Sequence, residues 1–215
     1  MSILLLATLL CACREDPGLP LYPGMGSDTG VPALPQGPDP YEAGERRLSL
    51  SIFYEGAYSD IVEIDNVTTH FYIWDESMSV TPSQDAVEGR SSDQITAGAL
   101  GWWGGGVYWD AGISFADWKT LHISLRSSDA TMEAVELGFG EGDSGSQRWV
   151  QASSYGFVAD DSWHHLKIPR ADLAIALNIS SISMPLNIRG SGNSGTSVLI
   201  DNVYYTDEEL EEGEQ

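Results

Sequence analysis

The chain has 215 residues and a net charge of −22, from 10 Lys and Arg against 32 Asp and Glu. Nucleic acid is therefore excluded as a partner, because a phosphate-binding surface needs a basic patch. The two cysteines, Cys11 and Cys13, lie together near the N-terminus, so no disulfide framework is expected to hold the fold. Hydrophobic residues make up 42% of the chain, which is enough for one folded domain with its own core.

Residues 1–12 have the features of a bacterial lipoprotein signal peptide. The apolar run 3–10 is too short to cross a bilayer and is typical of an export signal. The segment 10–13 (LCAC) resembles the lipobox, and this resemblance implies lipidation at Cys13; the alternative is a plain cleaved signal peptide. Because Arg14 rather than Asp follows, we expect an outer membrane lipoprotein of the cell envelope, periplasmic or surface-exposed, that meets the membrane through its lipid anchor only.

Two segments outside the predicted domain have the composition of disordered chain. Residues 13–45 are rich in Pro and Gly with no apolar periodicity, which predicts a disordered linker. Residues 207–215 carry acids and no base, which predicts a solvated acidic tail. The folded domain is therefore expected over residues 46–206.

This central region reads as β-structure throughout, with no convincing helix. Short runs of β-branched and aromatic residues predict strands at 48–54, 69–74, 92–97, 107–109, 120–126, 134–139, 148–152, 164–168, 179–187 and 197–205. Glycine-rich segments between them, such as 104–106 and 190–195, predict turns.

The strand near residue 120 shows how these segments are buried. Leu121, Ile123 and Leu125 alternate with polar residues, so one face is expected in the core and the other in water. Ten such strands in about 160 residues predict a single all-β domain, a two-sheet antiparallel β-sandwich of the jelly-roll type.

Three local motifs follow one another along the predicted domain: GWWGGGVYW at 101–109 followed by FADWKTL at 115–121, DSWHHLKIPRADL at 161–173, and VLIDNVYY at 198–205. They resemble the carbohydrate-binding-module branch of the galactose-binding-like jelly rolls, especially family eleven. The resemblance implies a non-catalytic domain that binds a polysaccharide, such as a β-linked glucan. A protein-interaction or envelope-assembly domain on the same fold, with a protein partner, is the alternative.

Aromatic side chains are the candidate sugar-binding groups, because an indole or phenol ring stacks on the C–H face of a pyranose. The candidates are Trp102, Trp103, Tyr108 and Trp109, with Arg148 and Trp149 as a further donor and platform. Successive residues of a strand face opposite ways, so one of the adjacent Trp102 and Trp103 is expected in the core. The alternative for each indole is burial between the sheets.

A structural calcium ion is a further expectation from the resemblance. Modules of this kind carry one against the last strand, and the aspartate of their Asp-Asn motif corresponds to Asp201. Glu55 and Glu88 are the expected partners, since hard cations prefer oxygen ligands. The alternative is that Asp201 accepts hydrogen bonds from local backbone N–H groups.

A jelly-roll glycosidase is a second, disfavoured alternative. The segment 63–67 (EIDNV) begins like the catalytic strand of laminarinase-type enzymes. A retaining glycosidase needs two carboxyl groups about 5 Å apart, and here Val67 or Thr68 stands where the second Glu is required. No enzyme activity is therefore expected.

Overall fold

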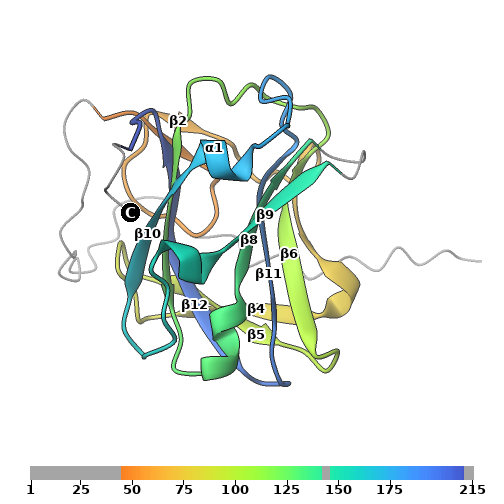
Figure 1. Cartoon of the computed structure of the whole chain (residues 1–215), viewed down its shortest axis with the longest axis vertical. Coiled ribbons are helices and arrows are strands. Elements are labelled where there is room, and N and C mark those ends of the chain that lie inside the picture. The colour runs from red at the N-terminus through yellow and green to blue at the C-terminus, as the bar shows by residue number, and fades with distance from the viewer. Residues whose placement is uncertain (1–44, 142–145, 211–215) are drawn as a thin grey trace, which may run out of the picture. The chain divides into compact units, whose positions relative to one another are not determined.

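The computed structural model of the protein describes residues 45–141 and 146–210 (Figure 1). The predicted signal peptide 1–12 and Cys13 lie outside the described residues, as does nearly all of the predicted linker. Within the described ranges no helix is long and apolar enough to cross a membrane.

The described residues form the expected all-β sandwich of two sheets. In the seven-stranded sheet, the order is β10 (His164–Pro169), β7 (Thr120–Arg126), β12 (Ser197–Thr206), β1 (Arg47–Ser49) and β2 (Asp60–Ile61), and β5 (Ser92–Ala97) joins β12 to β4 (Met78–Ser83). In the five-stranded sheet, the order is β3 (Thr69–Ile73), β6 (Trp102–Trp109), β11 (Met184–Ser191), β8 (Glu136–Gly140) and β9 (Gln147–Gln151). Pairing is antiparallel except between the short strands β1 and β2, which are parallel.

Helical structure in the described part of the chain is confined to short connections. These are the 3-10 turns η1 (Trp74–Glu76), η2 (Ala130–Ala134) and η3 (Ala152–Tyr155), and the single turn α1 (Arg170–Leu173). In Figure 1 the strands β10 and β12 lie on one side of the sandwich, and β6, β8 and β11 on the other.

Aromatic and aliphatic side chains from both sheets fill the space between them. Ile123 of β7 and Ile188 of β11 are fully buried, and the ring of Phe115 packs against Phe139 and Tyr205 with centroids 5.1 Å apart in both pairs. Removal of this apolar surface from water is the main stabilising contribution to the fold.

Several strand predictions differ from the structure. The segment 104–106 is not a turn but the middle of β6, since its glycines pair with β11 and, at Gly105 and Gly106, also with β3. The predicted strand 179–187 begins only at Met184 and continues to Ser191, into the predicted turn 190–195. The predicted strand 48–54 ends at Ser49, and the segment Met78–Ser83, which the sequence did not indicate, forms β4. Glycine has no side chain to display periodicity, which explains why the middle of β6 does not look like a strand.

Candidate carbohydrate-binding site

The outer face of the five-stranded sheet presents a row of residues that crosses all five strands. The register aligns Tyr72 of β3, Gly106 of β6, Asn187 of β11, Gly138 of β8 and Trp149 of β9. The backbones of Tyr72 and Trp149 are four strand spacings apart, which is about 19 Å. The two aromatic residues of this row therefore belong to the edge strands, while the three strands between them carry Gly or Asn.

A groove of about 390 Å³ lies on this face. Its lining consists of Tyr72, Ile73, Trp74, Gly106, Val107, Tyr108, Met184 and Asn187. The Tyr72 side chain is 48% exposed, and its ring meets that of Tyr108 edge to face at 6.2 Å. The volume is within the range of ligand pockets, and apolar rings beside an amide are the usual lining of such pockets.

Two glycines let the indole rings at this face lie directly on the sheet. A Cβ added to Gly104 would stand 2.6 Å from Cε3 of Trp74, and one added to Gly138 would stand 2.8 Å from the ring of Trp149. The two indoles meet each other edge to face, with centroids 6.0 Å apart. The glycines of β6 and β8 therefore accommodate the aromatic residues of the neighbouring segments.

Arg189 is held by two contacts, one with the ring of Trp149 and one with Glu136. Its guanidinium carbon is 3.9 Å from the centroid of the Trp149 ring, and its Nε is 2.6 Å from Oε2 of Glu136. The other carboxylate oxygen of Glu136 accepts a hydrogen bond of 2.9 Å from Nε2 of Gln151. The position of Trp149 thus depends on an ion pair as well as on Gly138.

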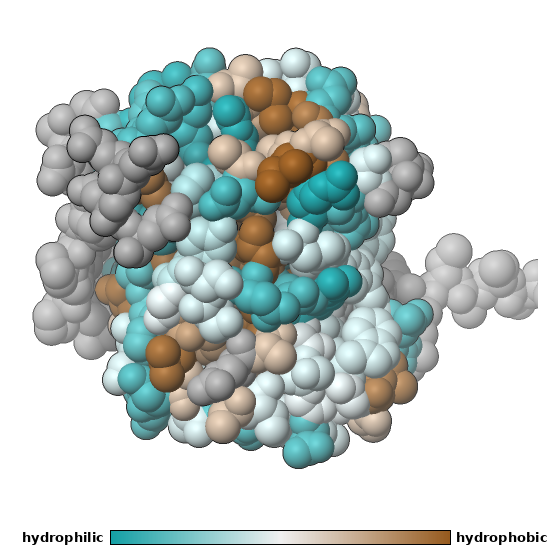
Figure 2. All heavy atoms as spheres, in the orientation of Figure 1, coloured by the Kyte–Doolittle hydropathy of each residue, from teal (hydrophilic) through white to brown (hydrophobic). Residues whose placement is uncertain are grey.

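Figure 2 shows that hydrophobic residues form only small, separate patches on the face in view. Tyr and Trp have hydropathies near the middle of the scale, so an aromatic binding surface does not stand out in this colouring. The face in view therefore shows no large aliphatic patch of the kind used for stable protein docking.

Two of the predicted sugar-binding residues are core residues, and this part of the prediction is wrong. Trp103 and Trp109 are 0% and 2% exposed, because they alternate with Trp102 and Tyr108 along β6 and face the opposite sheet. A Cβ on Gly190 would stand 2.6 Å from the buried ring of Trp103. These two indoles cannot meet a ligand.

The four other predicted side chains differ in where they lie relative to the groove. Tyr108 lines the groove and Trp149 stands at the far edge of the same face. Trp102 is 37% exposed on this face but does not line the groove. Arg148 alternates with Trp149, and its guanidinium donates to the carbonyl oxygens of Ile175 and Gln147, so it is no part of the groove.

Sequence reasoning missed Tyr72, Trp74, Asn187 and Arg189. A signal for the first two was present, because His70, Tyr72 and Trp74 recur at every second position and therefore share one face. Asn187 and Arg189 carried no such signal. Their position beside the glycines of β6 follows only from the register between β6 and β11.

The three predicted calcium ligands lie in one cluster and accept hydrogen bonds from backbone N–H groups. Asp201 accepts from Val87 at 2.7 Å and from Glu88 at 3.1 Å, and the carboxylate of Glu88 accepts from the backbone of Glu55 at 2.9 Å. Burial raises the pKa of Asp201 to about 6, against the lowering effect of its N–H donors. Within residues 45–141 and 146–210, no three His, Cys, Asp or Glu side chains are arranged as ligands of one metal ion.

The outer face of the seven-stranded sheet has a different character. His122 is 3% exposed, lies parallel to the Tyr204 ring at 4.5 Å, and contacts His165 through Nδ1 at 3.1 Å and Thr206 through Nε2 at 3.2 Å. The guanidinium of Arg47 lies 4.3 Å from the Tyr204 centroid. Burial, followed by the charges nearby, lowers the pKa of His122 to about 3. His122 and Arg47 therefore cover the ring of Tyr204.

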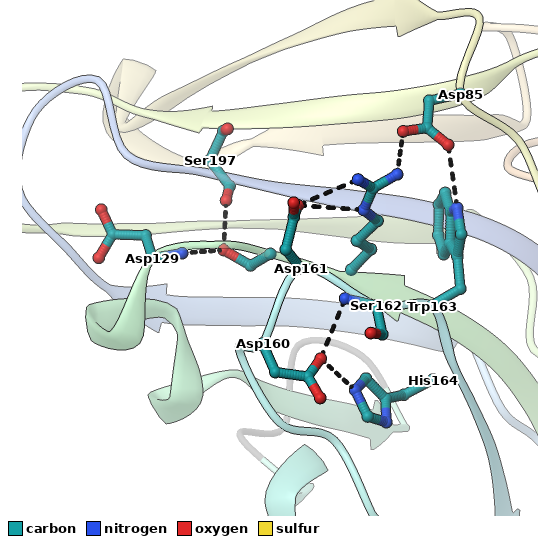
Figure 3. Close-up of polar contacts among 10 residues, drawn as sticks. Asp85, Asp129, Asp160, Asp161, Ser162, Trp163, His164 and Ser197 are labelled. Carbon is teal, nitrogen blue, oxygen red and sulfur yellow. Dashed lines mark hydrogen bonds and ion pairs between the residues drawn. The ribbon is translucent and has the colours of Figure 1, made fainter.

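Ion pairs connect loops at one end of the sandwich (Figure 3). Arg126 pairs with Asp85 and with Asp161, the latter at 3.0 Å, and Nε1 of Trp163 donates to Asp85 at 3.2 Å. Asp160 accepts from the ring of His164 at 2.8 Å. All these polar groups are used within the cluster, which indicates a role in holding the loops.

The segment that suggested a glycosidase forms a turn. Residues 62–65 are not part of a strand. Oδ1 of Asp65 accepts from the backbone N–H groups of Val67, Thr68 and Thr69 at 2.8, 2.8 and 2.9 Å, which holds its pKa well below the usual range. This carboxylate therefore caps the start of β3.

The two-sheet sandwich with an aromatic groove on the outer face of one sheet fits the class that the sequence motifs predicted, the β-sandwich carbohydrate-binding modules. The family model for carbohydrate binding domain 30 matches residues 51–207, so the chain belongs to that family. The resemblance to such modules is confirmed, and the family is number 30. A search of curated proteins finds no match.

Solved structures of this class share the fold. The family 30 module of the cellulosomal cellulase Cel9D-Cel44B of Clostridium thermocellum is 16% identical, with 67% of this chain and 94% of that chain covered and a TM-score of 0.53. The family 11 module of the cellulase Lic26A-Cel5E of the same organism is 12% identical, with 80% and 99% covered and a TM-score of 0.53. A family 11 module in complex with a β-1,3-1,4-mixed-linked tetrasaccharide is 14% identical, with 77% and 96% covered and a TM-score of 0.51. Identities this low show the fold alone.

Proposed function

We propose that the groove on the outer face of the five-stranded sheet binds a β-linked glucan by aromatic stacking. The observation that carries this proposal is the exposed ring of Tyr72 beside Trp74 and Tyr108, above a floor of Gly106 and Asn187. The rings offer flat surfaces to the C–H faces of sugars, and the amide of Asn187 offers hydrogen bonds to hydroxyl groups. The solved family 11 complex with a mixed-linked tetrasaccharide supports the choice of glycan.

Native gel electrophoresis of the full chain in embedded polysaccharides tests this function. Mixed-linked β-glucan is expected to retard the wild-type protein, and Tyr72→Ala and Trp74→Ala are expected to abolish the retardation. Trp163→Ala is the matched control, because Trp163 lies in the ion-paired loop cluster rather than in the groove. Absence of retardation across a broad panel of glycans would refute the proposal and favour a protein partner.

The exported, lipid-anchored form is part of the same proposal. Its support is the apolar run 3–10 and the segment 10–13, and it implies an outer membrane location with the domain beyond the linker. Mass spectrometry of the protein from a membrane fraction is expected to show lipid on Cys13. Cys13→Ala should release the protein from the membrane and Cys11→Ala should not. Equal release of the two variants would contradict lipidation at Cys13.

Calcium at Glu55, Glu88 and Asp201 also remains a proposal. Its support is the cluster of three carboxylates and the buried Oδ1 of Asn202, which has no hydrogen-bond partner. Against it, the carboxylate oxygens of Asp201 already accept backbone N–H groups, and among the described residues no three acidic, His or Cys side chains are arranged around one ion. Calcium binding predicts a melting temperature that falls with a chelator and returns with Ca²⁺. An unchanged melting temperature would indicate that these carboxylates only accept hydrogen bonds from backbone N–H groups.

A further inference from the structure

The outer face of the five-stranded sheet carries one arginine and one glutamate, and they neutralise each other. Among the residues of β3, β6, β8, β9 and β11, the Asp, Glu, Lys and Arg side chains are Glu136, Arg148 and Arg189. His70 of β3 also lies on this side, with its Nε2 3.8 Å from Asp110. Arg148 is turned away and donates to carbonyl oxygens. The Nε of Arg189 is 2.6 Å from Glu136, so this face has no net charge from its own strands.

The carboxylate of Glu136 is held in place from two sides. Gln151 donates to one oxygen at 2.9 Å and Arg189 to the other, and the ion pair is partly shielded, with Glu136 at 25% side-chain exposure. The guanidinium is also stacked on Trp149 at 3.9 Å. Arg189 is therefore already engaged by a carboxylate of the protein when a ligand arrives.

The remaining groups around the groove suit hydroxyl groups. Asn187 lies at the centre of the face, and Gln147 and Gln151 lie on the same side of β9 as Trp149. Asp75 and Glu76, both exposed, follow Trp74 and add negative charge near the groove. A carboxylate on a ligand would meet this negative charge with no available Lys or Arg on these strands, and like charges in an interface lower affinity.

We propose that Glu136 is a specificity-determining residue that restricts the groove to uncharged glycans. By neutralising Arg189, it prevents the guanidinium from donating to the carboxylate of a uronic acid, for which an arginine fork is well suited. It also keeps Arg189 against Trp149. This inference rests on the proposed function, because it assigns the chemical class of glycan that the same groove accepts.

A matched pair of ligands tests the proposal with the full chain. One is a mixed-linked β-glucan tetrasaccharide, and the other is the same oligosaccharide oxidised at C6 to uronic acids. Titration calorimetry in 0.15 M salt limits long-range repulsion from the acidic chain, because the screening length there is about 8 Å. The wild-type protein is expected to bind the neutral ligand at least about tenfold more tightly, the effect of one unfavourable charged contact.

Glu136→Gln removes the charge and keeps the shape and the acceptor for Gln151. It is expected to bind the oxidised ligand about tenfold more tightly than wild type, the worth of one charge-assisted hydrogen bond. The readout is the ratio of its affinities for the two ligands, because a displaced Trp149 would weaken both alike. Thermal melting of the variant shows whether it is folded. Adding Arg189→Gln to Glu136→Gln should remove the gain.

The outcomes separate this inference from the proposed function. If neither ligand binds the wild-type protein, the proposed function fails and the inference falls with it. If the neutral ligand binds and the oxidised one binds as tightly, the function stands and the inference is wrong. The inference is also wrong if Glu136→Gln gains no affinity for the oxidised ligand, or if the gain survives the change at Arg189.

Discussion

The outer faces of the two sheets both carry aromatic residues, yet only one presents them to solvent. On the seven-stranded sheet, Tyr204 is 2% exposed, with His122 stacked against it and Arg47 over its ring. On the five-stranded sheet, Tyr72 is 48% exposed and Trp74 lies against Gly104. The first arrangement uses its rings for stability, while the second leaves ring surface for a ligand.

Glycine accounts for much of this difference. The β6 residues that face outward between Trp102 and Tyr108 are Gly104 and Gly106, and their lack of side chains forms the floor beside Trp74. At the equivalent places on β7, outward-facing His122 and Ser124 fill the surface and bond to His165. A binding face therefore needs small residues as much as it needs large ones.

The largest expected effect is the difference between a tryptophan substitution in the core and one in the groove. Trp103→Ala is expected to lower the free energy of unfolding by about 3–5 kcal/mol, because it leaves a cavity in the fully buried core. Trp74→Ala is expected to cost far less stability and to abolish glycan binding. Urea denaturation and gel retardation of the two variants measure both effects. Equal loss of stability in the two would contradict the distinction.

A pair of alanine substitutions at glycine sharpens the same comparison. An added Cβ would stand 2.6 Å from the Trp74 ring at Gly104 and 2.6 Å from the Trp103 ring at Gly190. Gly190→Ala should destabilise the core by about 1–3 kcal/mol, the usual cost of overpacking. Gly104→Ala should displace Trp74 and weaken glycan binding with a smaller loss of stability. Retained affinity in Gly104→Ala would show that the position of Trp74 is unimportant.

The seven-stranded face should respond to acid through His122. Its folded pKa is about 3 and its ordinary value is 6.5, so the unfolded chain takes up a proton between these values and the folded protein does not. The free energy of unfolding should therefore fall by a few kcal/mol as the pH drops from 6.5 toward 3.

Comparison with His122→Phe isolates this effect, because phenylalanine keeps a ring against Tyr204 but does not titrate. Asp201, with a pKa raised to about 6, has the opposite sign and stabilises the fold as the pH falls below 6. That contribution is common to both proteins and cancels in the difference. Urea denaturation at pH 7.5 and 4.5 should show a smaller loss in the variant; parallel losses would contradict the assignment to His122.

The loop cluster in Figure 3 should give the smallest effect. Arg126→Ala removes ion pairs to Asp85 and Asp161, whose side chains are 45% and 62% exposed. Exposed pairs contribute about 0–1 kcal/mol each and weaken with salt. Thermal melting at low and high salt should show a slight, salt-dependent loss, with glycan binding unchanged. A loss of binding would place this cluster in the site.

The sequence predicted the sandwich because hydrophobic alternation is a local property, as in Leu121, Ile123 and Leu125. It did not predict which indoles face water, because that depends on which side of β6 packs against the other sheet. It missed the middle of β6 because glycine carries no hydrophobic signal. The place of Asn187 and Arg189 opposite those glycines depends on strand register, which no short motif reveals.

The most direct test of the aromatic groove is an NMR titration of the full chain, labelled at its seven tryptophans, with a mixed-linked β-glucan tetrasaccharide. The indole N–H signals of Trp74 and Trp149 are expected to shift. The signals of buried Trp103 and Trp109, and that of Trp163 in the loop cluster, should stay in place. Shifts at Trp163 without shifts at Trp74 would place the glycan elsewhere and contradict the account.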